Sequence, residues 1–168
     1  EIEVFLANDY TLKSIGSNII NNIFRDVTGS IWVGTQEGIS YFDPIKQGFQ
    51  TISFQFGSDK GLLDKNVWAI YSNDTLIWVG TREGVTCIDT RINKYYQFPF
   101  KSTNLNEPSN NSVFNINIDA KGTIWTCTSS GLFKLIISND FSDFKYEKVP
   151  FRTPESPWDD DICYRVKF

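Results

Sequence analysis

Histidine and methionine are both absent from the 168 residues of this chain. Without histidine, the chain cannot form a Ser-His-Asp triad, a Cys-His nucleophile pair or a histidine-ligated zinc site. We therefore predict no catalytic residue, no metal ligand and no cofactor in this chain. The lack of methionine, including an initiator, fits an expectation that the chain is part of a longer protein.

Long apolar runs and clusters of basic residues are also missing. No stretch of about 20 apolar residues occurs, so we expect no direct membrane insertion by this chain. The net charge is −4 without a basic stripe, which makes nucleic acid an unexpected partner. The acidic run 159–161 lacks the glycine and the spaced oxygen ligands of a calcium loop, and a solvated connection is the favoured interpretation.

Cysteine is scarce, with Cys87, Cys127 and Cys163 as the three examples. The number is odd, and no two of them are closely spaced. Cys87 and Cys127 fall in different predicted strand types of different repeats. We therefore predict small buried thiols in preference to a disulfide or a metal site.

The sequence does contain a repeat rich in aromatic residues. Residues 31–43 and 77–89 both begin Ile-Trp-Val-Gly-Thr, and eight of their thirteen positions are identical. A weaker copy over residues 124–132 keeps the isoleucine, tryptophan, threonine and glycine. The anchoring tryptophans at 32, 78 and 125 are therefore 46 and 47 residues apart. A fixed period of this length, built from strands, is typical of radial repeat proteins.

Each repeat is predicted to form four antiparallel strands joined by hairpin turns. Turn residues such as Asn, Asp and Gly separate the first strand from the tryptophan strand. Gly38, Gly84 and Gly131 follow the tryptophan strand, and we expect them to adopt positive φ angles. The first strands are expected at 19–25, 67–71 and 113–118, the third strands at 39–43, 85–89 and 132–137, and the outer strands at 49–54, 95–98 and 144–149.

Adjacent apolar residues in these strands indicate sheets that are covered on both faces. Gly34 and Gly80 come two residues after their tryptophans, where a neighbouring sheet is expected to approach closely. Cys127 takes that place in the third copy as a small substitute. The fold class is therefore all-β, a β-propeller segment with four-stranded antiparallel blades and about three and a half blades present. A β-sandwich or an open β-solenoid would account less well for one period occurring three times.

The predicted boundaries follow the repeat, and all parts belong to one propeller domain. Residues 1–16 are expected to supply outer strands of a preceding blade and residues 153–168 the start of a following one. The blades between them are predicted at 17–58, 59–107 and 108–152. The expected partners are the remaining blades of the same protein, or a second copy that completes a ring of about seven blades.

The segment Asp26-x-x-Gly29 followed by Ile-Trp-Val-Gly-Thr-x-x-Gly resembles the two-component regulator propeller repeat. The second copy departs from that pattern with Ser-Asn-Asp-Thr at residues 72–75. The third keeps Asp119-x-x-Gly122 and loses the Val-Gly pair after its tryptophan. The resemblance extends over about residues 17–150.

This resemblance implies a function as well as a fold. Such propellers form the periplasmic sensor regions of membrane-bound hybrid two-component regulators in Bacteroidetes, and they help to detect oligosaccharides from glycan breakdown. The chain is then a non-catalytic recognition module on the periplasmic side, and the full-length protein carries a histidine kinase. The alternative is a secreted propeller enzyme, or a structural or protein-interaction scaffold without a signalling role. Similarity to streptogramin lyase is disfavoured, because that propeller enzyme uses histidine.

Residues that vary between copies are the candidates for ligand binding. They lie in the turns before each recurring glycine, on the same predicted face as loops that contain Lys60, Asp64–Asn66 and 106–111. Solvated turn residues are the simpler interpretation, and no aromatic platform for a sugar is evident outside core positions. Asp43 and Asp89 are interpreted as turn acceptors, not as a hydrolytic pair. The ligand-binding candidates are Gln36, Glu37, Arg82, Glu83, Ser129 and Ser130.

Overall fold

The computed structural model describes residues 4–8, 14–43, 48–55, 57–73, 75–100, 112–150 and 162–167. Over these residues it contains three four-stranded antiparallel sheets, each with its strands in sequence order. This confirms the predicted all-β propeller with four-stranded blades. The first blade consists of β1 (Ile20–Arg25), β2 (Ile31–Thr35), β3 (Gly38–Asp43) and β4 (Gly48–Ile52). The second consists of β5 (Val67–Asn73), β6 (Leu76–Thr81), β7 (Gly84–Asp89) and β8 (Lys94–Pro99). The third consists of β9 (Val113–Ile118), β10 (Ile124–Thr128), β11 (Gly131–Ile137) and β12 (Phe144–Val149).

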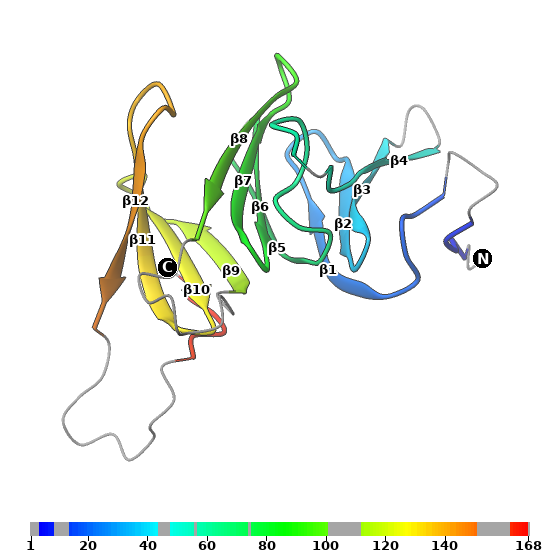
Figure 1. The fold of residues 1–168 in the computed structure, drawn as a ribbon. Coiled ribbons are helices and arrows are strands. Elements are labelled where there is room, and N and C mark those ends of the chain that lie inside the picture. Colours follow the sequence, from blue (N-terminus) through cyan, green and yellow to red (C-terminus); the bar gives the residue numbers. More distant parts are fainter. Residues whose placement is uncertain are drawn as a thin grey trace.

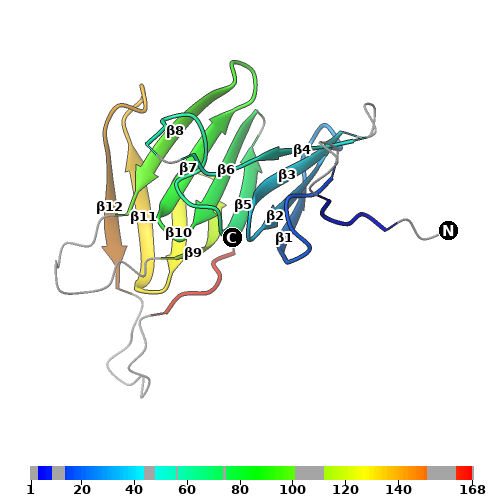
Figure 2. The same ribbon diagram turned by 45° about the vertical axis from the view of Figure 1, so that its right-hand side comes forward.

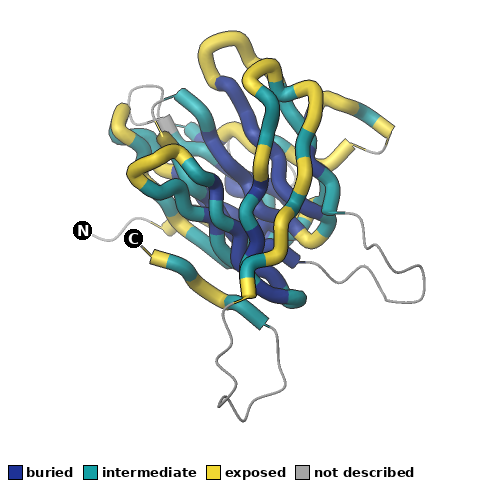
Figure 3. Tube along the Cα trace, turned by 90° about the vertical axis from the view of Figure 1, so that its left-hand side faces the viewer, coloured by how far each residue is buried: buried dark blue, intermediate teal, exposed yellow. Residues whose placement is uncertain are grey.

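The three blades stand beside one another in a fan (Figures 1 and 2). Contacts between neighbouring blades run through the first strands, because β5 touches both β1 and β9. Figure 3 shows that buried residues concentrate in the sheets and exposed residues in the turns. Two apolar clusters lie between blades, one around Trp32 and Ile77 and the other around Trp78 and Ile116.

The turn between the first two strands explains why aspartate and tryptophan recur together. Asp26 Oδ1 accepts hydrogen bonds from the backbone N–H groups of Thr28 at 2.9 Å and Ser30 at 3.0 Å. Its Oδ2 accepts the indole N–H of Trp32 at 2.8 Å. Asp119 holds the indole of Trp125 in the same way at 3.0 Å. The carboxylate closes the turn and fixes the tryptophan that fills the space between blades.

The second blade achieves the same result with a shorter turn. The side-chain oxygen of Asn73 accepts the indole N–H of Trp78 at 3.1 Å. Asn73 also pairs with Leu76 across the β5–β6 hairpin, which leaves two residues in the turn. This tighter hairpin explains why the tryptophan of the second copy comes one residue earlier after its first strand.

The second turn depends on a threonine and a glycine. Thr35 Oγ1 donates a hydrogen bond to the carbonyl of Gly38 at 2.9 Å, and Thr81 and Thr128 make the equivalent bonds at 3.0 Å. Gly38, Gly84 and Gly131 have φ angles of 113°, 136° and 129°, which confirms the predicted positive values. A Cβ at Gly38 would also lie 2.4 Å from the carbonyl oxygen of Ile52.

In the first two copies, the glycine two residues after the tryptophan permits close blade packing, as predicted. A Cβ on Gly34 would lie 2.8 Å from Val67 Cγ1, and one on Gly80 would lie 2.9 Å from Val113 Cγ1. Each valine is the first residue of the next blade's inner strand. The Gly–Val contact is therefore the repeated junction between neighbouring blades.

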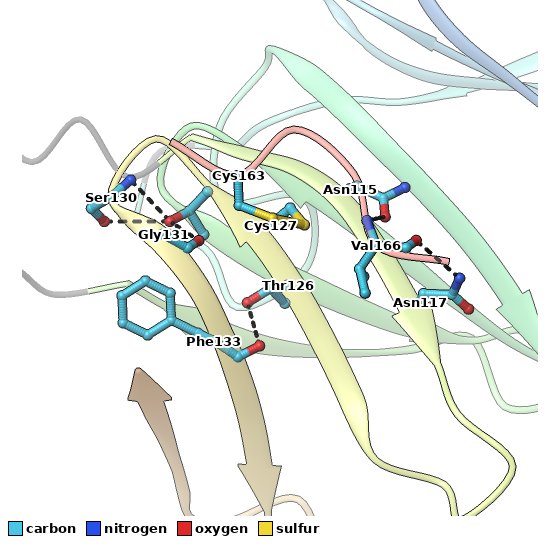
Figure 4. Close-up of a disulfide and its surroundings, with 10 residues drawn as sticks. Asn115, Asn117, Thr126, Cys127, Ser130, Gly131, Phe133, Cys163 and Val166 are labelled. Carbon is cyan, nitrogen blue, oxygen red and sulfur yellow. Dashed lines mark hydrogen bonds between the residues drawn. A yellow bond between two sulfur atoms is a disulfide. The ribbon is translucent and has the colours of Figure 1, made fainter. Parts of the chain in front are cut away.

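The cysteine prediction was wrong for two of the three residues. Cys127 and Cys163 form a disulfide with a Cα–Cα distance of 4.7 Å (Figure 4). Cys127 occupies the glycine position of the junction, and Cys163 occupies the valine position held by Val67 and Val113. The blade geometry brings these two positions together, and a Cys pair replaces the Gly–Val contact. Cys87 is free and buried, as predicted, and burial raises the pKa of its thiol to about 12.

The ends of the described chain lie against the blades but form no strands there. Residues 162–167 run beside β9, where Val166 N–H donates to Asn115 Oδ1 and Asn117 Nδ2 donates to the Val166 carbonyl (Figure 4). Near the other end, the Phe5 ring lies 5.7 Å from Phe42 and 5.3 Å from Phe49 between ring centroids.

Candidate functional site

The six side chains selected from the sequence lie on the β2–β3, β6–β7 and β10–β11 turns. Two of these turns contact segments that lead into a first strand, which is β5 of the next blade for the first turn and β9 of the same blade for the third. Gly38 N–H donates to the Lys65 carbonyl at 2.7 Å, and Ser129 N–H donates to the Ser112 carbonyl at 3.2 Å. The expectation that both loop types open on one face is confirmed for the described residues. The loop 106–111 lies outside them.

Several of the six candidates take part in turn structure. Glu37 forms an exposed ion pair with Lys65 at 2.7 Å, and this hydrogen bond raises the pKa of the lysine. The Glu83 carbonyl accepts the N–H of Phe100. Ser130 N–H donates to Thr128 Oγ1 at 3.1 Å. Gln36 is partly exposed, Arg82 is exposed and Ser129 is partly exposed.

A cavity of about 540 Å³ lies elsewhere, between the first and second blades. Its first wall is a cross-strand row in which Trp32 pairs with Tyr41 and Tyr41 pairs with Gln50. The Trp32 and Tyr41 rings are stacked at 4.9 Å between centroids. The opposite wall comes from β6, β7 and β8. The remaining lining residues are Asp26, Thr28, Ser30, Ile52, Thr75, Ile77, Ile88, Thr90, Asn93 and Tyr95.

A second cavity of about 410 Å³ adjoins the first. The two share Ile52, Asn93 and Tyr95 and are therefore adjacent, and we call them together the first inter-blade groove. Asp26 lies in the larger cavity and Lys60 lines the smaller one. A volume of several hundred Å³ with aromatic walls and a few polar groups is typical of small-molecule sites.

Among the described residues that line the larger cavity, the one carboxylate is that of Asp26, and it is bound within its own turn. Burial pushes the pKa of Asp26 upward, but the hydrogen bonds from Thr28, Trp32 and Ser30 outweigh burial, so the net pKa is below its ordinary value. The group is therefore ionised at neutral pH and its oxygens are occupied. Asp26 thus suits a structural role better than that of a general acid, which needs a raised pKa.

The other acidic residues weighed from the sequence behave as turn residues where they are described. Asp89 accepts the backbone N–H of Arg91 at 3.0 Å and forms a 3.0 Å ion pair with its guanidinium. This confirms the predicted acceptor role of Asp89, while the side chain of Asp43 lies outside the described part. Within the described ranges, no group of three or more His, Cys, Asp or Glu side chains could hold a metal ion.

Sequence reasoning missed the groove because its walls combine scaffold and variable positions. Trp32 was interpreted as blade core, and it is 5% exposed. The alternation of β2, β3 and β4 places Trp32, Tyr41 and Gln50 in one row, and that pattern was available in the sequence. The opposite wall depends on how closely the next blade approaches, which the sequence pattern does not give.

A second aromatic row was also missed, on the inner strands. The Phe114 ring lies 6.1 Å from Trp68 and 5.4 Å from Tyr164 between centroids. Trp68 and Phe114 each occupy a register irregularity of their strand, and such bulges redirect a side chain. The expectation that no aromatic cluster exists outside the core was therefore wrong.

Comparison with known proteins supports the reading of the repeat. The family model for the two component regulator propeller matches residues 14–37. The match covers 24 residues, which resemble one copy of that repeat. The matched residues include Asp26, Gly29, Trp32 and Gly34, which build the turn and the close blade contact described above. No curated protein matches the chain.

Solved structures of similar fold are extracellular domains from B. thetaiotaomicron. The BT4673 domain, assigned to a one component system, is 22% identical with a TM-score of 0.66, and the match covers 89% of this chain and 19% of that chain. A second BT4673 structure, assigned to a hybrid two component system, is 20% identical with a TM-score of 0.66, and the match covers 90% of this chain and 19% of that chain. The BT3049 domain, also assigned to a hybrid two component system, is 22% identical with a TM-score of 0.63, and the match covers 85% of this chain and 18% of that chain.

At these TM-scores, the three structural matches show a shared propeller fold. The chain spans about a fifth of the length of the structures that it matches. In its described residues, no helix has the length and apolar character needed to cross a membrane.

Proposed function

We propose that this chain is part of the sensor propeller of a membrane-bound hybrid two-component regulator that responds to oligosaccharides from glycan breakdown. The observation that carries the proposal is the regulator repeat at residues 14–37 in a chain whose fold matches extracellular domains of such systems. The propeller serves recognition and not catalysis. Signalling through a histidine kinase belongs to other parts of the full-length protein.

The disulfide supports a periplasmic location. Disulfides persist in oxidising compartments such as the bacterial periplasm and are rare in reducing cytoplasm. The disulfide joins the buried Cys127 to the partly exposed Cys163, between a blade and the following segment. This disulfide can stabilise the junction only in a compartment where the two cysteines remain oxidised.

The exposed face of the first blade supports further blades as partners. Ile23 is 66% exposed, whereas its repeat equivalents Ile70 and Ile116 are 7% and 2% exposed. Ile31 is 36% exposed, whereas its equivalent Ile77 is 1% exposed. In the second and third blades this face is covered by the preceding blade. We infer that a blade of the same protein, or of a second copy, covers Ile23 and Ile31.

The test is calorimetric titration of the complete extracellular region with oligosaccharides from digests of individual polysaccharides. Saturable binding of one oligosaccharide class is expected, with no change in the chain length of the sugar after incubation. Release of shorter sugars by the purified protein would instead indicate a secreted propeller enzyme. A transcriptional reporter in the native host should respond to the same class, and a lack of response with intact binding would indicate a scaffold without signalling.

A further inference from the structure

We propose that the first inter-blade groove is the binding site for a neutral oligosaccharide, held between the Tyr41 and Tyr95 rings. This inference rests on the proposed function for the class of ligand, and it places the site away from the turn residues selected from the sequence. None of those six residues lines either cavity of the groove.

The junction between the second and third blades provides an internal comparison. There the equivalent row consists of Trp78, Cys87 and Tyr96. The Phe141 ring covers this row, with its centroid 4.3 Å from that of Tyr96 and 6.5 Å from that of Trp78. One junction is therefore filled by an aromatic side chain of the third blade, whereas the other retains a cavity of about 540 Å³.

The difference arises in the turn between the third and fourth strands. Phe141 lies in the β11–β12 turn with a φ of 62°, which is unusual for a bulky residue. Its N–H donates to the Ser138 carbonyl at 3.0 Å, and Asp140 accepts hydrogen bonds from the Ser138 and Ser142 hydroxyls at 2.7 Å. A hydrogen-bonded turn thus holds the ring against the second blade.

The corresponding turn of the second blade places a polar residue there instead. Asn93 ends the β7–β8 turn with a φ of 51°, a conformation that asparagine tolerates well. Asn93 is exposed and borders both cavities. The first junction therefore presents an amide where the other presents a phenyl ring, and the groove stays open.

The groove combines the groups that recognise a sugar ring. Tyr41 and Tyr95 line opposite walls and supply flat apolar faces, to which the C–H face of a pyranose is complementary. Gln50 and Asn93 are exposed at the rim, and each amide can both donate and accept hydrogen bonds from hydroxyl groups. Because the two cavities are adjacent, together they suit a linear ligand of more than one ring.

Charge in the groove favours a neutral ligand. Asp26 is ionised and lines the larger cavity, and none of the described residues that line this cavity is a lysine or arginine. Lys60 lines the adjoining cavity. An acidic sugar seated on the tyrosines would therefore lie near a carboxylate without a cation beside it. Like charges at short range would disfavour that complex.

The experiment uses the complete extracellular region and isothermal titration calorimetry with xylo-, manno-, malto- and cello-oligosaccharides. Asn93→Phe should fill the groove as Phe141 fills the next one, and it should lower affinity by about 100-fold, the effect of losing a well-packed contact of ~3 kcal/mol. Gln50→Ala should lower affinity about fivefold, because it removes one hydrogen bond of ~1 kcal/mol.

The matched controls come from the third blade. Glu147→Ala changes the repeat equivalent of Gln50, and Asn139→Phe adds a phenylalanine to the exposed β11–β12 turn. Both should bind as the unmodified protein does. Circular dichroism reports whether Asn93→Phe folds, and the exposed Gln50→Ala variant decides the matter if it does not.

Four results would overturn the inference. If a neutral sugar binds and Gln50→Ala and Asn93→Phe bind it unchanged, the groove is not the site, although the proposed function stands. The groove is also not the site, and the proposed function again stands, if the double variant Gln36→Ala and Arg82→Ala abolishes binding while the groove variants retain it. If pectin- or heparin-derived acidic oligosaccharides bind and neutral ones do not, the ligand class is wrong. If neither class binds, the inference and the oligosaccharide-sensing function fail together.

Discussion

The Cys127–Cys163 junction allows a sharp test of how neighbouring blades pack. Replacing Cys127 with glycine and Cys163 with valine recreates the contact of the other two junctions. The double variant Cys127→Ala and Cys163→Val differs from the Gly–Val variant by a single methyl group. Alanine normally stabilises a strand relative to glycine by about 0.5–1 kcal/mol. We expect the opposite order here, with the Gly–Val variant the more stable.

The magnitude follows from the geometry of the equivalent positions. A Cβ at Gly34 or Gly80 would lie 2.8 or 2.9 Å from a valine γ-carbon of the next blade. Forcing a methyl group into such a space typically costs about 1–3 kcal/mol. Both variants also lose the cross-link, whose 36-residue separation corresponds to about 3.8 kcal/mol of loop-closure entropy in the unfolded chain. The disulfide-bonded protein should therefore be the most stable of the three.

Hydrogen exchange measured by mass spectrometry can locate the effect. Loss of the cross-link should increase exchange in residues 162–167 and in β9. Without it, this segment is held by non-covalent contacts such as the hydrogen bonds of Val166 with Asn115 and Asn117 and the ring contact of Tyr164 with Phe114. The first blade lies two sheets away and serves as the internal control. If the Ala–Val variant were protected as well as or better than the Gly–Val variant, the equivalence of this junction with the other two would be wrong.

Three further predictions concern the scaffold and the turn face. Gly80→Ala should destabilise the junction between the second and third blades by about 1–3 kcal/mol, measured by thermal unfolding. Gly122→Ala is the control, because a Cβ added there meets nothing within 4 Å. It should lack the clash and show only the smaller penalty of its positive φ. The hydrogen bond from Trp125 lowers the pKa of Asp119, so its stabilising effect is present above the unfolded pKa of about 3.9 and is lost as the pH falls through the lower folded value. Tryptophan fluorescence during acid titration should show this loss, and Asp119→Asn should remove that part of the pH dependence. Gln36→Ala with Arg82→Ala should leave the calorimetric affinity unchanged if the groove is the site, and a large loss would return the site to the turns.

The repeat could be predicted from the sequence because it is fixed by local chemistry. Asp26, Gly38 and Trp32 each have a role within one hairpin, so their spacing reveals the strands. Where the ends of strands depend on neighbours, the prediction was less accurate. The outer strand expected to continue to residue 54 ends at Ile52, because Phe54 leaves the sheet and forms a bridge with Leu62.

The disulfide and the groove depend on contacts between blades. Cys163 lies 50 residues after Val113, outside the period of 46 or 47, so its place in the junction was not recognised. The groove depends on which side chain the turn between the third and fourth strands presents to the preceding blade. Asn93 and Phe141 are single residues in turns of different length, and neither forms part of the repeat pattern.

The central claim is that this propeller recognises an oligosaccharide in the first inter-blade groove. Its most direct test is a crystal structure of the complete extracellular region soaked with the oligosaccharide that gives calorimetric saturation. We expect a pyranose ring between Tyr41 and Tyr95, with Gln50 or Asn93 hydrogen-bonded to its hydroxyl groups. A sugar bound at the β2–β3, β6–β7 and β10–β11 turns, with the groove empty, would contradict it.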